Sequence, residues 1–271
     1  TSFAQTPPEV RDHLSYPKQP NFFLSFDWFQ LLFETCLQKT MSPRIYVALD
    51  ETGMPLGSLM CGVPRNSRLR ELVSLSNFYT MEYSASLVGD RPDIAAELIR
   101  FIGAERPKWH LLRLNVLKNT GEVRAMLDQM QKEGFRLHRF FQFDNWHIDV
   151  NGKTFEQYFS ERPSSLRRDI IRREKKLAST RPFEIKISTQ DGVRLVGIVA
   201  DYVTVYNHSW KQTEPFPEFI PRLAAVCHAA GILRMGVLYL EGKPVAAQIW
   251  IGSGPKALIY KIAYDEEYRE L

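Results

Sequence analysis

The hydrophobic and polar positions of the chain follow two alternating periods, one typical of helices and one typical of strands. Residues 25–39 carry apolar side chains at helical spacing, and either Ser25 or Asp27 can cap the start of this helix. Residues 44–63 contain two runs of strand-like composition joined by an acidic, glycine-containing turn, which predicts a β-hairpin. A third strand is expected at residues 70–76.

The rest of the first half continues this alternation of helices and strands. The pattern predicts helices at 91–105 and 121–134 and strands at 109–117 and 141–150. Helices that alternate with strands in this way favour a mixed α/β layer.

The second half repeats the order of the first. After a basic helix at residues 162–177 we expect a strand at 183–189, a helix at 191–208, a helix ending at Gly231 and a hairpin at 233–252. This hairpin is similar to the first at an offset of about 190 residues, which is explained either by two related halves or by a chance match of one hairpin. Residues 64–150 follow the first hairpin within its half, whereas only 253–271 follow the second, so the second half is expected to be incomplete.

Bulk composition describes a chain that can bury a core. It has 271 residues, of which 44% are hydrophobic and 24% charged, enough for two modest domains, expected at residues 1–150 and 151–271. No apolar run reaches the length of about 20 residues needed to cross a bilayer, and the first residues lack the order of a signal peptide. We therefore expect a cytoplasmic protein without a membrane span.

Cysteine and histidine usage argues against metal chemistry. Cys36, Cys61 and Cys227 are odd in number and widely spaced, which favours buried free thiols over disulfides or a zinc site. The six histidines do not form an H-E-x-x-H or similar motif. Neither a bound metal nor metal catalysis is expected.

The basic charge is concentrated in one segment. Residues 167–176 hold six basic and two acidic residues, so their net charge of +4 equals that of the whole chain. A protein that coats nucleic acid usually spreads basic surface over a whole face. A helical wheel places an apolar stripe of Leu166, Ile170 and Leu177 toward the core and sets Arg168 and Arg172 opposite it. That face is either solvated or binds an anionic ligand, donor phosphates or an acidic acceptor.

Two other places are candidates for a binding site. The loop at 207–217 sets Trp210 and Lys211 at a helix end, where they either hold a ligand or fill a structural role. Gln248 and Trp250 alternate with isoleucines along a strand, so they form either the wall of a substrate groove or a solvated face. The glycine-rich residues 252–256 lie between two apolar strands and predict a hairpin turn rather than a phosphate loop.

Several motifs in order resemble a known family. The array "TFEQYFSERPSSLRRDIIRREKKL", "DY…SWK", "GILRMGVLYLEGKPVAAQIWI" and "YKIAYDEEY" resembles the GNAT-type acyltransferases of the Fem-like group, in particular the CelD-type acetyltransferases associated with bacterial polysaccharide and cellulose synthesis. The resemblance is strongest over residues 154–271 and weaker in "NFFLSFDWFQLLFE" and "SLSNFYTMEY". It implies an α/β (α+β) fold of two GNAT-like halves, each with a mostly antiparallel sheet flanked by helices.

The resemblance also implies chemistry. It implies an acyl-CoA-dependent N- or O-acetyltransferase that uses acetyl-CoA as donor and an amine or hydroxyl acceptor, such as a saccharide or a cell-envelope precursor. The family's Pro-Gly element, which holds the donor pyrophosphate, is expected after Leu271, so no residue here is assigned to it. Tyr260, Lys261 and Tyr264 are the candidate catalytic residues, because they lie on the strand next to the implied groove.

Two other functions stay open beside this one. A Fem-type transferase would take its group from aminoacyl-tRNA and would use the basic helix to bind that RNA. The sequence has no sustained heptad run of the kind that such enzymes often carry as an insertion, which favours acyl-CoA. A non-catalytic binding protein that has kept the fold is the third possibility.

Overall fold

The computed structural model describes residues 2–188 and 194–270, and its backbone divides into two compact units. The described residues up to Phe140, with Pro215–Ala230 and Gly252–Lys256, form the first unit, and the other described residues form the second. Each unit is organised around its own sheet. The domain boundary expected at residue 150 stays a prediction.

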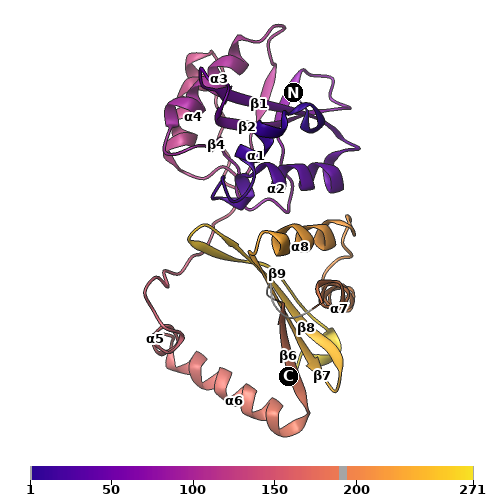
Figure 1. Cartoon of the computed structure of the whole chain (residues 1–271). Helices are drawn as coiled ribbons and strands as arrows, with labels where there is room; N and C mark the ends of the chain where they lie inside the picture. Colours follow the sequence, from indigo (N-terminus) through magenta and orange to yellow (C-terminus); the bar gives the residue numbers. More distant parts are fainter. Residues whose placement is uncertain (1, 189–193, 271) are drawn as a thin grey trace. The chain divides into compact units, whose positions relative to one another are not determined.

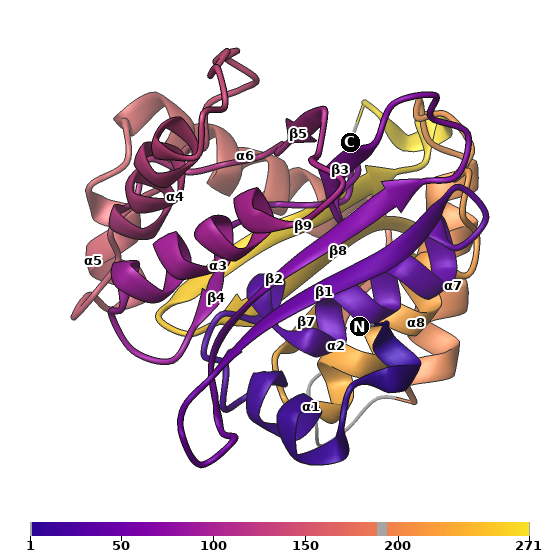
Figure 2. The ribbon, with the colours of Figure 1, turned by 90° about the horizontal axis from the view of Figure 1, so that it is seen from above.

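The sheet of the first unit is built on an antiparallel hairpin (Figure 2). Its strands are β1 (Met41–Leu49), β2 (Pro55–Pro64), β3 (Glu71–Ser74), β4 (Ser86–Leu87) and β5 (Leu111–Arg113). The path runs β1-β2-β3-β5, with β3 antiparallel to β2, β5 parallel to β3, and β4 paired with β2. The predicted first hairpin and third strand are confirmed.

The turn of this hairpin is held by a side chain. Asp50 Oδ1 accepts the backbone N–H groups of Thr52 and Met54 at 2.8 and 2.9 Å. Gly53 has a φ of 85°, a left-handed conformation that glycine adopts without a steric penalty. The acidic and glycine-containing sequence read as a turn therefore closes the hairpin in the expected way.

Helices and short helical turns flank the sheet of the first unit. They are η1 (Phe3–Gln5), α1 (Pro8–Leu14), η2 (Phe22–Leu24), α2 (Phe26–Leu32), the π-helical η3 (Phe33–Leu37), α3 (Pro92–Ala104), α4 (Gly121–Lys132) and α8 (Phe219–Ala229). Ser25 caps α2 by accepting the Trp28 N–H at 3.3 Å, as predicted. Figure 2 shows α3 running along β1 and β2 with α4 beside it.

Aromatic side chains fill the core of the first unit. The Phe219 ring of α8 stacks on Tyr79 with 4.0 Å between centroids and meets Trp28 of α2 edge to face at 6.0 Å. Trp28 and Phe219 are both 0% exposed. Burial of such large rings is a main source of stability for a domain of this size.

The second unit contains a four-stranded sheet in the order β6-β7-β8-β9. Its strands are β6 (Phe183–Ser188), β7 (Leu233–Leu240), β8 (Lys243–Ser253) and β9 (Lys256–Tyr264). β7 pairs antiparallel with both β6 and β8. The β7–β8 turn places Glu241 and Gly242 at φ values of 50° and 82°, as a two-residue hairpin loop requires. The second predicted hairpin and the turn at 252–256 are confirmed.

One face of this sheet is covered by α7 (Leu195–Asn207), which packs on β7 (Figure 1). Met235 and Val237 of β7 and Ile249 of β8 are buried there, at 0 to 1% exposure. Because successive residues of a strand point to opposite faces, the residues between them lie on the other face. Two neighbouring residues of one strand therefore do not face the same site.

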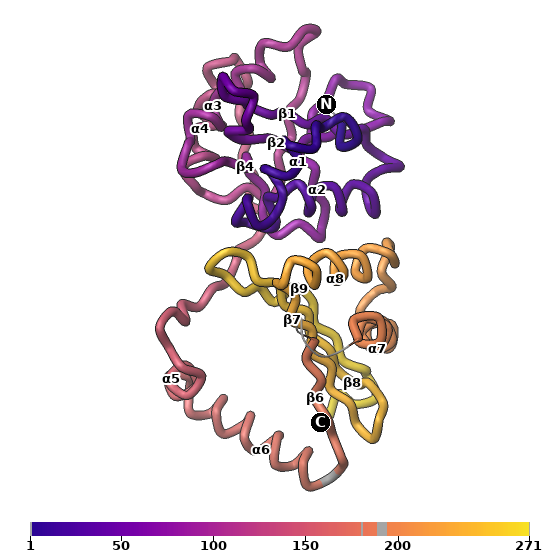
Figure 3. The backbone as a smooth tube through the Cα atoms, viewed as in Figure 1, coloured from indigo at the N-terminus to yellow at the C-terminus, as the bar shows by residue number. Residues whose placement is uncertain are grey.

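Residues 141–150 were predicted to form a strand, and this prediction is wrong. The backbone from Phe135 to Gly152 contains neither helix nor strand (Figure 3). A strand needs a neighbouring strand for its backbone hydrogen bonds, and no strand of the described chain pairs with this segment. Its apolar side chains stay exposed, with Trp146 at 95%.

The basic segment forms a helix, but its apolar stripe is not in a core. α5 (Phe155–Ser160) precedes α6 (Ser164–Thr180), and η4 (Glu266–Tyr268) follows β9. Leu166 and Ile170, expected to face the core, are 46% and 43% exposed, so that expectation is wrong. Local contacts hold α6 instead, because Asp169 pairs with Arg172 and Arg173 one turn further on.

Candidate active site

The loop after α7 carries the residues that meet the end of β9. Ser209 Oγ donates to the Tyr206 carbonyl at 2.7 Å and accepts the Lys211 N–H at 3.4 Å, which closes the turn at the helix end. The Glu266 N–H donates to the His208 carbonyl at 3.2 Å. These bonds tie the start of the loop to the segment that follows β9. We call the side chains gathered here the α7–β9 cluster, and its members are Tyr202, Tyr206, Trp210, Lys211, Glu214, Lys261 and Tyr264.

Two predicted site residues meet directly in this cluster. The rings of Trp210 and Tyr264 lie 4.4 Å apart between centroids at an interplanar angle of 35°. Trp210 is 49% exposed, so it does not fill a core, which was the structural role considered for it. An aromatic pair half open to solvent offers a flat surface for an apolar or sugar-like group.

Lys211 lies beside the same aromatic pair. Its ammonium donates to the carbonyl of Ile262 on β9 and lies 5.2 Å from the Trp210 ring and 5.7 Å from the Tyr206 ring. Burial, followed by repulsion from Lys261, lowers the pKa of Lys211, while the charge of Glu214 acts in the opposite direction. Two ammonium groups therefore lie near one carboxylate, with which Lys261 pairs, and the seven residues of the cluster hold two basic side chains and one acidic side chain.

The ion pair between Lys261 and Glu214 lies at the centre of the cluster. The side chains are only 17% and 12% exposed, and the Lys261 ammonium lies 5.2 Å from the Tyr206 ring. Sequence reasoning singled out Lys261 but missed Glu214. The available signal was the single carboxylate in the loop "NHSWKQTEPFP", which had already been chosen as a candidate site.

Two tyrosines of α7 form the floor of the cluster. The Tyr206 hydroxyl donates to the Gln212 carbonyl at 3.2 Å, and burial together with the charge of Glu214 raises the pKa of Tyr206 to about 12. Tyr202 is 1% exposed, and its hydroxyl has no hydrogen-bond partner in the part of the chain that the structure describes. Burial and the Glu214 charge also raise the pKa of Tyr202. Both phenols therefore stay protonated at neutral pH.

Three other predicted site residues lie on the opposite face of the sheet. Ala247 and Ile249 of β8 are buried, so Gln248 and Trp250 between them point away from α7. Trp250 Nε1 donates to Gln248 Oε1 at 2.9 Å. Tyr260 precedes Lys261 on β9 and by the same alternation points away from Glu214, whereas Tyr264 has the parity of Tyr260 but is the last residue of the strand, where its ring meets Trp210. The structure thus does not gather Tyr260, Gln248 and Trp250 with Lys211 and Lys261.

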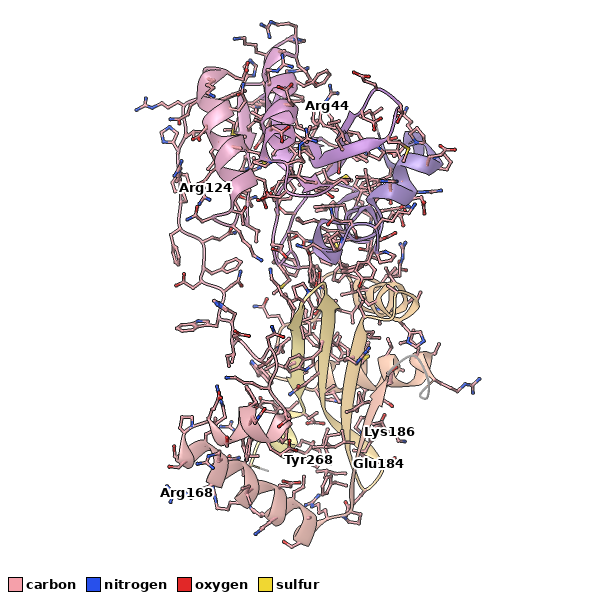
Figure 4. The ribbon with its side chains drawn as sticks, turned by 60° about the vertical axis from the view of Figure 1, so that its left-hand side comes forward. Arg44, Arg124, Arg168, Glu184, Lys186 and Tyr268 are labelled. Carbon is pink, nitrogen blue, oxygen red and sulfur yellow. The ribbon has the colours of Figure 1, made fainter. Side chains whose placement is uncertain are left out.

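Arg168, labelled in Figure 4, and Arg172 lie on α6 and are exposed. Arg168 Nε donates to the Ser164 carbonyl at 3.2 Å, and Arg172 pairs with Asp169. The polar partners of both residues within the described chain belong to α6 itself. Neither arginine contacts the α7–β9 cluster, so a role in the same site stays a prediction.

Cys36, Cys61 and Cys227 are buried free thiols, as predicted, and burial raises the pKa of Cys61 to about 12. Residues 2–188 and 194–270 contain no cluster of three potential metal-ligating side chains. Across the same residues, no helix combines the length and apolar character that a membrane span needs.

A known protein family matches the part of the chain that contains the cluster. Residues 164–271 match the acetyltransferase (GNAT) domain family. The matched range contains all seven residues of the α7–β9 cluster. No curated protein matches the chain.

Comparison with solved structures bears on the fold. The crystal structure of FemX is similar over 98% of this chain and 80% of its own, with a TM-score of 0.60 at 11% identity. L-PGS from Bacillus licheniformis aligns over 83% of this chain and 59% of its own, with a TM-score of 0.47 at 13% identity. The C-terminal domain of a putative lysylphosphatidylglycerol synthetase from Agrobacterium fabrum aligns over 82% and 60%, with a TM-score of 0.45 at 14% identity. The likeness to FemX, with the two sheets flanked by helices, confirms the predicted GNAT-like α/β fold.

Proposed function

We propose that this chain is an acyltransferase that moves the acetyl group of acetyl-CoA to an amine or hydroxyl, with the α7–β9 cluster as its active site. The family match over residues 164–271 carries this proposal, because the cluster lies wholly within the matched range. The acceptor that we propose is a saccharide or a cell-envelope precursor. The proposal includes a cytoplasmic location, which the buried free thiols favour.

The reaction requires few catalytic groups from the protein. A thioester is already activated, so the enzyme must position the acceptor, stabilise the oxyanion that develops on the carbonyl and accept a proton. An ammonium has three N–H donors and no acceptor, so Lys261 suits the oxyanion rather than the proton. Tyr264, which is 39% exposed, can donate its hydroxyl hydrogen to the acceptor or the leaving thiolate.

The other predicted residues receive binding roles in this proposal. Trp210 offers a stacking surface, and Lys211 supplies charge for an acidic acceptor. Gln248, Trp250 and Tyr260 would contact substrate only from the opposite face of the sheet. Arg168 and Arg172 would bind the phosphates of the donor, which match guanidinium groups in geometry and charge.

A donor screen tests the proposal. Acetyl-CoA is added with glucosamine, glucose or glycylglycine as a sugar amine, a sugar hydroxyl or a peptide amine, and the released thiol is followed with a thiol-reactive dye. The three cysteines of the chain are buried, so they contribute little background. We expect thiol release that depends on the acceptor, and thermal stabilisation by acetyl-CoA that follows its concentration.

Aminoacyl-tRNA serves as the competing donor in the same screen. Transfer from aminoacyl-tRNA together with salt-sensitive RNA binding would replace acetyl-CoA as the donor. Absence of transfer from either donor to all three acceptors, with no stabilisation by acetyl-CoA, would reject an acyltransferase function of this chain.

A further inference from the structure

The α7–β9 cluster contains one carboxylate that the proposed function has not used. Glu214 is 12% exposed and faces the ammonium of Lys261 from β9, the rings of Tyr202 and Tyr206 from α7, and Lys211 from its own loop. Every other ionisable group in the cluster is an ammonium or a phenol. An ammonium has no lone pair to accept a proton and a phenol is a far weaker base than a carboxylate, so Glu214 is the group of the cluster suited to receive one.

Resting on the proposed function, we propose that Glu214 is the catalytic proton acceptor of this site. The acceptor nitrogen or oxygen attacks the carbonyl carbon of the thioester, the new C–N or C–O bond forms, and the C–S bond breaks. The proton of the attacking atom passes to the Glu214 carboxylate. It then passes to the departing thiolate, which leaves as a thiol and returns Glu214 to its carboxylate form.

The surroundings of Glu214 suit this role. Lys261 holds the carboxylate at the wall of the cluster and keeps it from turning into solvent. The unpartnered, buried hydroxyl of Tyr202 beside it is a donor without an acceptor in the described chain. A buried donor of this kind is costly to leave unpaired, and an oxygen or nitrogen lone pair of a bound acceptor would satisfy it. The geometry therefore sets an unsatisfied hydrogen-bond donor beside the carboxylate that we propose as the base.

Asp265 is another carboxylate near the cluster, and both of its oxygens already have partners. Its Oδ1 accepts the Glu267 N–H at 3.0 Å, which caps η4, and its Oδ2 lies 3.9 Å from Nδ1 of His208. His208 is 63% exposed, whereas the Asp265 side chain is 14% exposed, so the cap bond to Glu267 rather than burial distinguishes Asp265 from Glu214. Asp265 is thus a structural cap rather than the base.

The test compares Glu214 with an ion-paired glutamate outside the site. Glu184 pairs with Lys186 at 3.4 Å on β6 (Figure 4) and provides the matched control. With acetyl-CoA and the fastest of the three acceptors, Glu214→Gln should lower kcat by about 100- to 10,000-fold, the range expected for loss of a positioned base. Acetyl-CoA should still raise the Tm of this variant, and Glu184→Gln should keep the wild-type kcat.

Chemical rescue separates catalysis from structure. Glu214→Ala leaves space for a small carboxylate, so added formate should raise its kcat at least tenfold and leave Glu184→Ala unchanged. A Glu214→Gln kcat within tenfold of wild type, or no response of Glu214→Ala to formate, would overturn this assignment while wild-type turnover upholds the proposed function. A wild-type chain without turnover from any donor would overturn both.

Discussion

The ring of Trp210 packs at a tilt against Tyr264 and so joins the loop after α7 to the last residue of β9, with 4.4 Å between the ring centroids. This contact is the outer wall of the α7–β9 cluster, whereas the pair formed by Lys261 and Glu214 lies deeper, at 17% and 12% exposure. Aromatic surface is therefore presented at the rim and charge below it. A ligand that binds here would stack first and meet the ionised groups with its reacting end.

The rim contact predicts the effect of removing the indole. Trp210→Ala should lower the free energy of unfolding by about 0.5 to 1.5 kcal/mol, the usual worth of an aromatic pair, and should raise the KM of the acceptor more than it lowers kcat. Trp210→Phe keeps a ring and should retain most of both. Chemical denaturation and steady-state kinetics measure the two effects. Trp146→Ala, at a residue 95% exposed, is the control, and an equal loss there would contradict the role of the rim.

The buried hydroxyl of Tyr202 predicts a gain in stability on its removal. A buried polar group without a partner costs about 1 to 3 kcal/mol, so Tyr202→Phe should unfold at a higher Tm than the wild type when no ligand is present. The same variant should bind the acceptor more weakly. Tyr206→Phe loses a hydrogen bond to the Gln212 carbonyl and should instead be less stable. A Tyr202→Phe variant that is less stable than wild type would show that its hydroxyl is already satisfied.

The secondary structure was largely predictable, because the elements that formed as expected carry their own local signals. The hairpin turn at Gly53 and the serine cap at Ser25 are examples in which a residue type dictates a backbone geometry. The strand predicted at 141–150 failed for the opposite reason. Its composition favours a strand, but a strand forms only where a neighbouring strand offers hydrogen-bond partners. The composition of a segment does not show whether such a neighbour is present.

The site was predictable only in part. Trp210, Lys211, Lys261 and Tyr264 were chosen from their neighbourhoods and do meet, whereas Tyr260 was chosen by the same reasoning and alternates with Lys261 along β9. Strand alternation separates Tyr260 from Lys261, but the sequence does not say which of the two faces α7. Glu214 pairs with a lysine 47 positions further along the chain, and a lone carboxylate in a loop gives no sign of such a partner.

The aromatic core of the first unit predicts a large effect for a residue of α8. Phe219 is 0% exposed and contacts both Tyr79 and Trp28, so Phe219→Ala should lower the free energy of unfolding by about 3 to 5 kcal/mol. Phe140→Ala, at a side chain 87% exposed, should change it by about 0.5 kcal/mol or less. Denaturant unfolding followed by far-UV circular dichroism measures both. A Phe219→Ala variant as stable as Phe140→Ala would show that α8 does not belong to this core.

The basic helix predicts a charge effect that depends on position. If Arg168 and Arg172 bind donor phosphates, reversing both to Glu should weaken acetyl-CoA binding by about tenfold or more, the worth of one charged hydrogen bond. Reversing Lys175 and Lys176 changes the net charge equally on the same helix and is the matched control. The thermal shift with acetyl-CoA at low and high salt measures the affinity. If both double variants lose the same affinity for acetyl-CoA, α6 attracts the anion through its net charge alone, and Arg168 and Arg172 have no specific role.

Lys211 predicts a pH-dependent stability whose sign follows from its surroundings. Burial and the charge of Lys261 lower its pKa below the ordinary value of about 10.4, and Glu214 offsets this only in part. Well below the folded-state pKa both states hold the proton, and the full cost of the buried charge is present. As the pH rises through that pKa the folded chain releases its proton first, so the unfolded chain binds more protons and stability increases.

Replacement of Lys211 should remove this dependence. The difference in the free energy of unfolding, Lys211→Met minus wild type, should be more favourable to the variant at pH 7 than at pH 9.5. At pH 7 the wild type bears the cost of the buried charge, whereas toward pH 9.5 the folded wild type begins to release that proton. Lys243→Met, at an exposed lysine of β8, should show the same difference from wild type at both values. Denaturant midpoints at the two pH values give the comparison. A Lys211→Met difference that does not change with pH would mean that Lys211 keeps its proton up to pH 9.5.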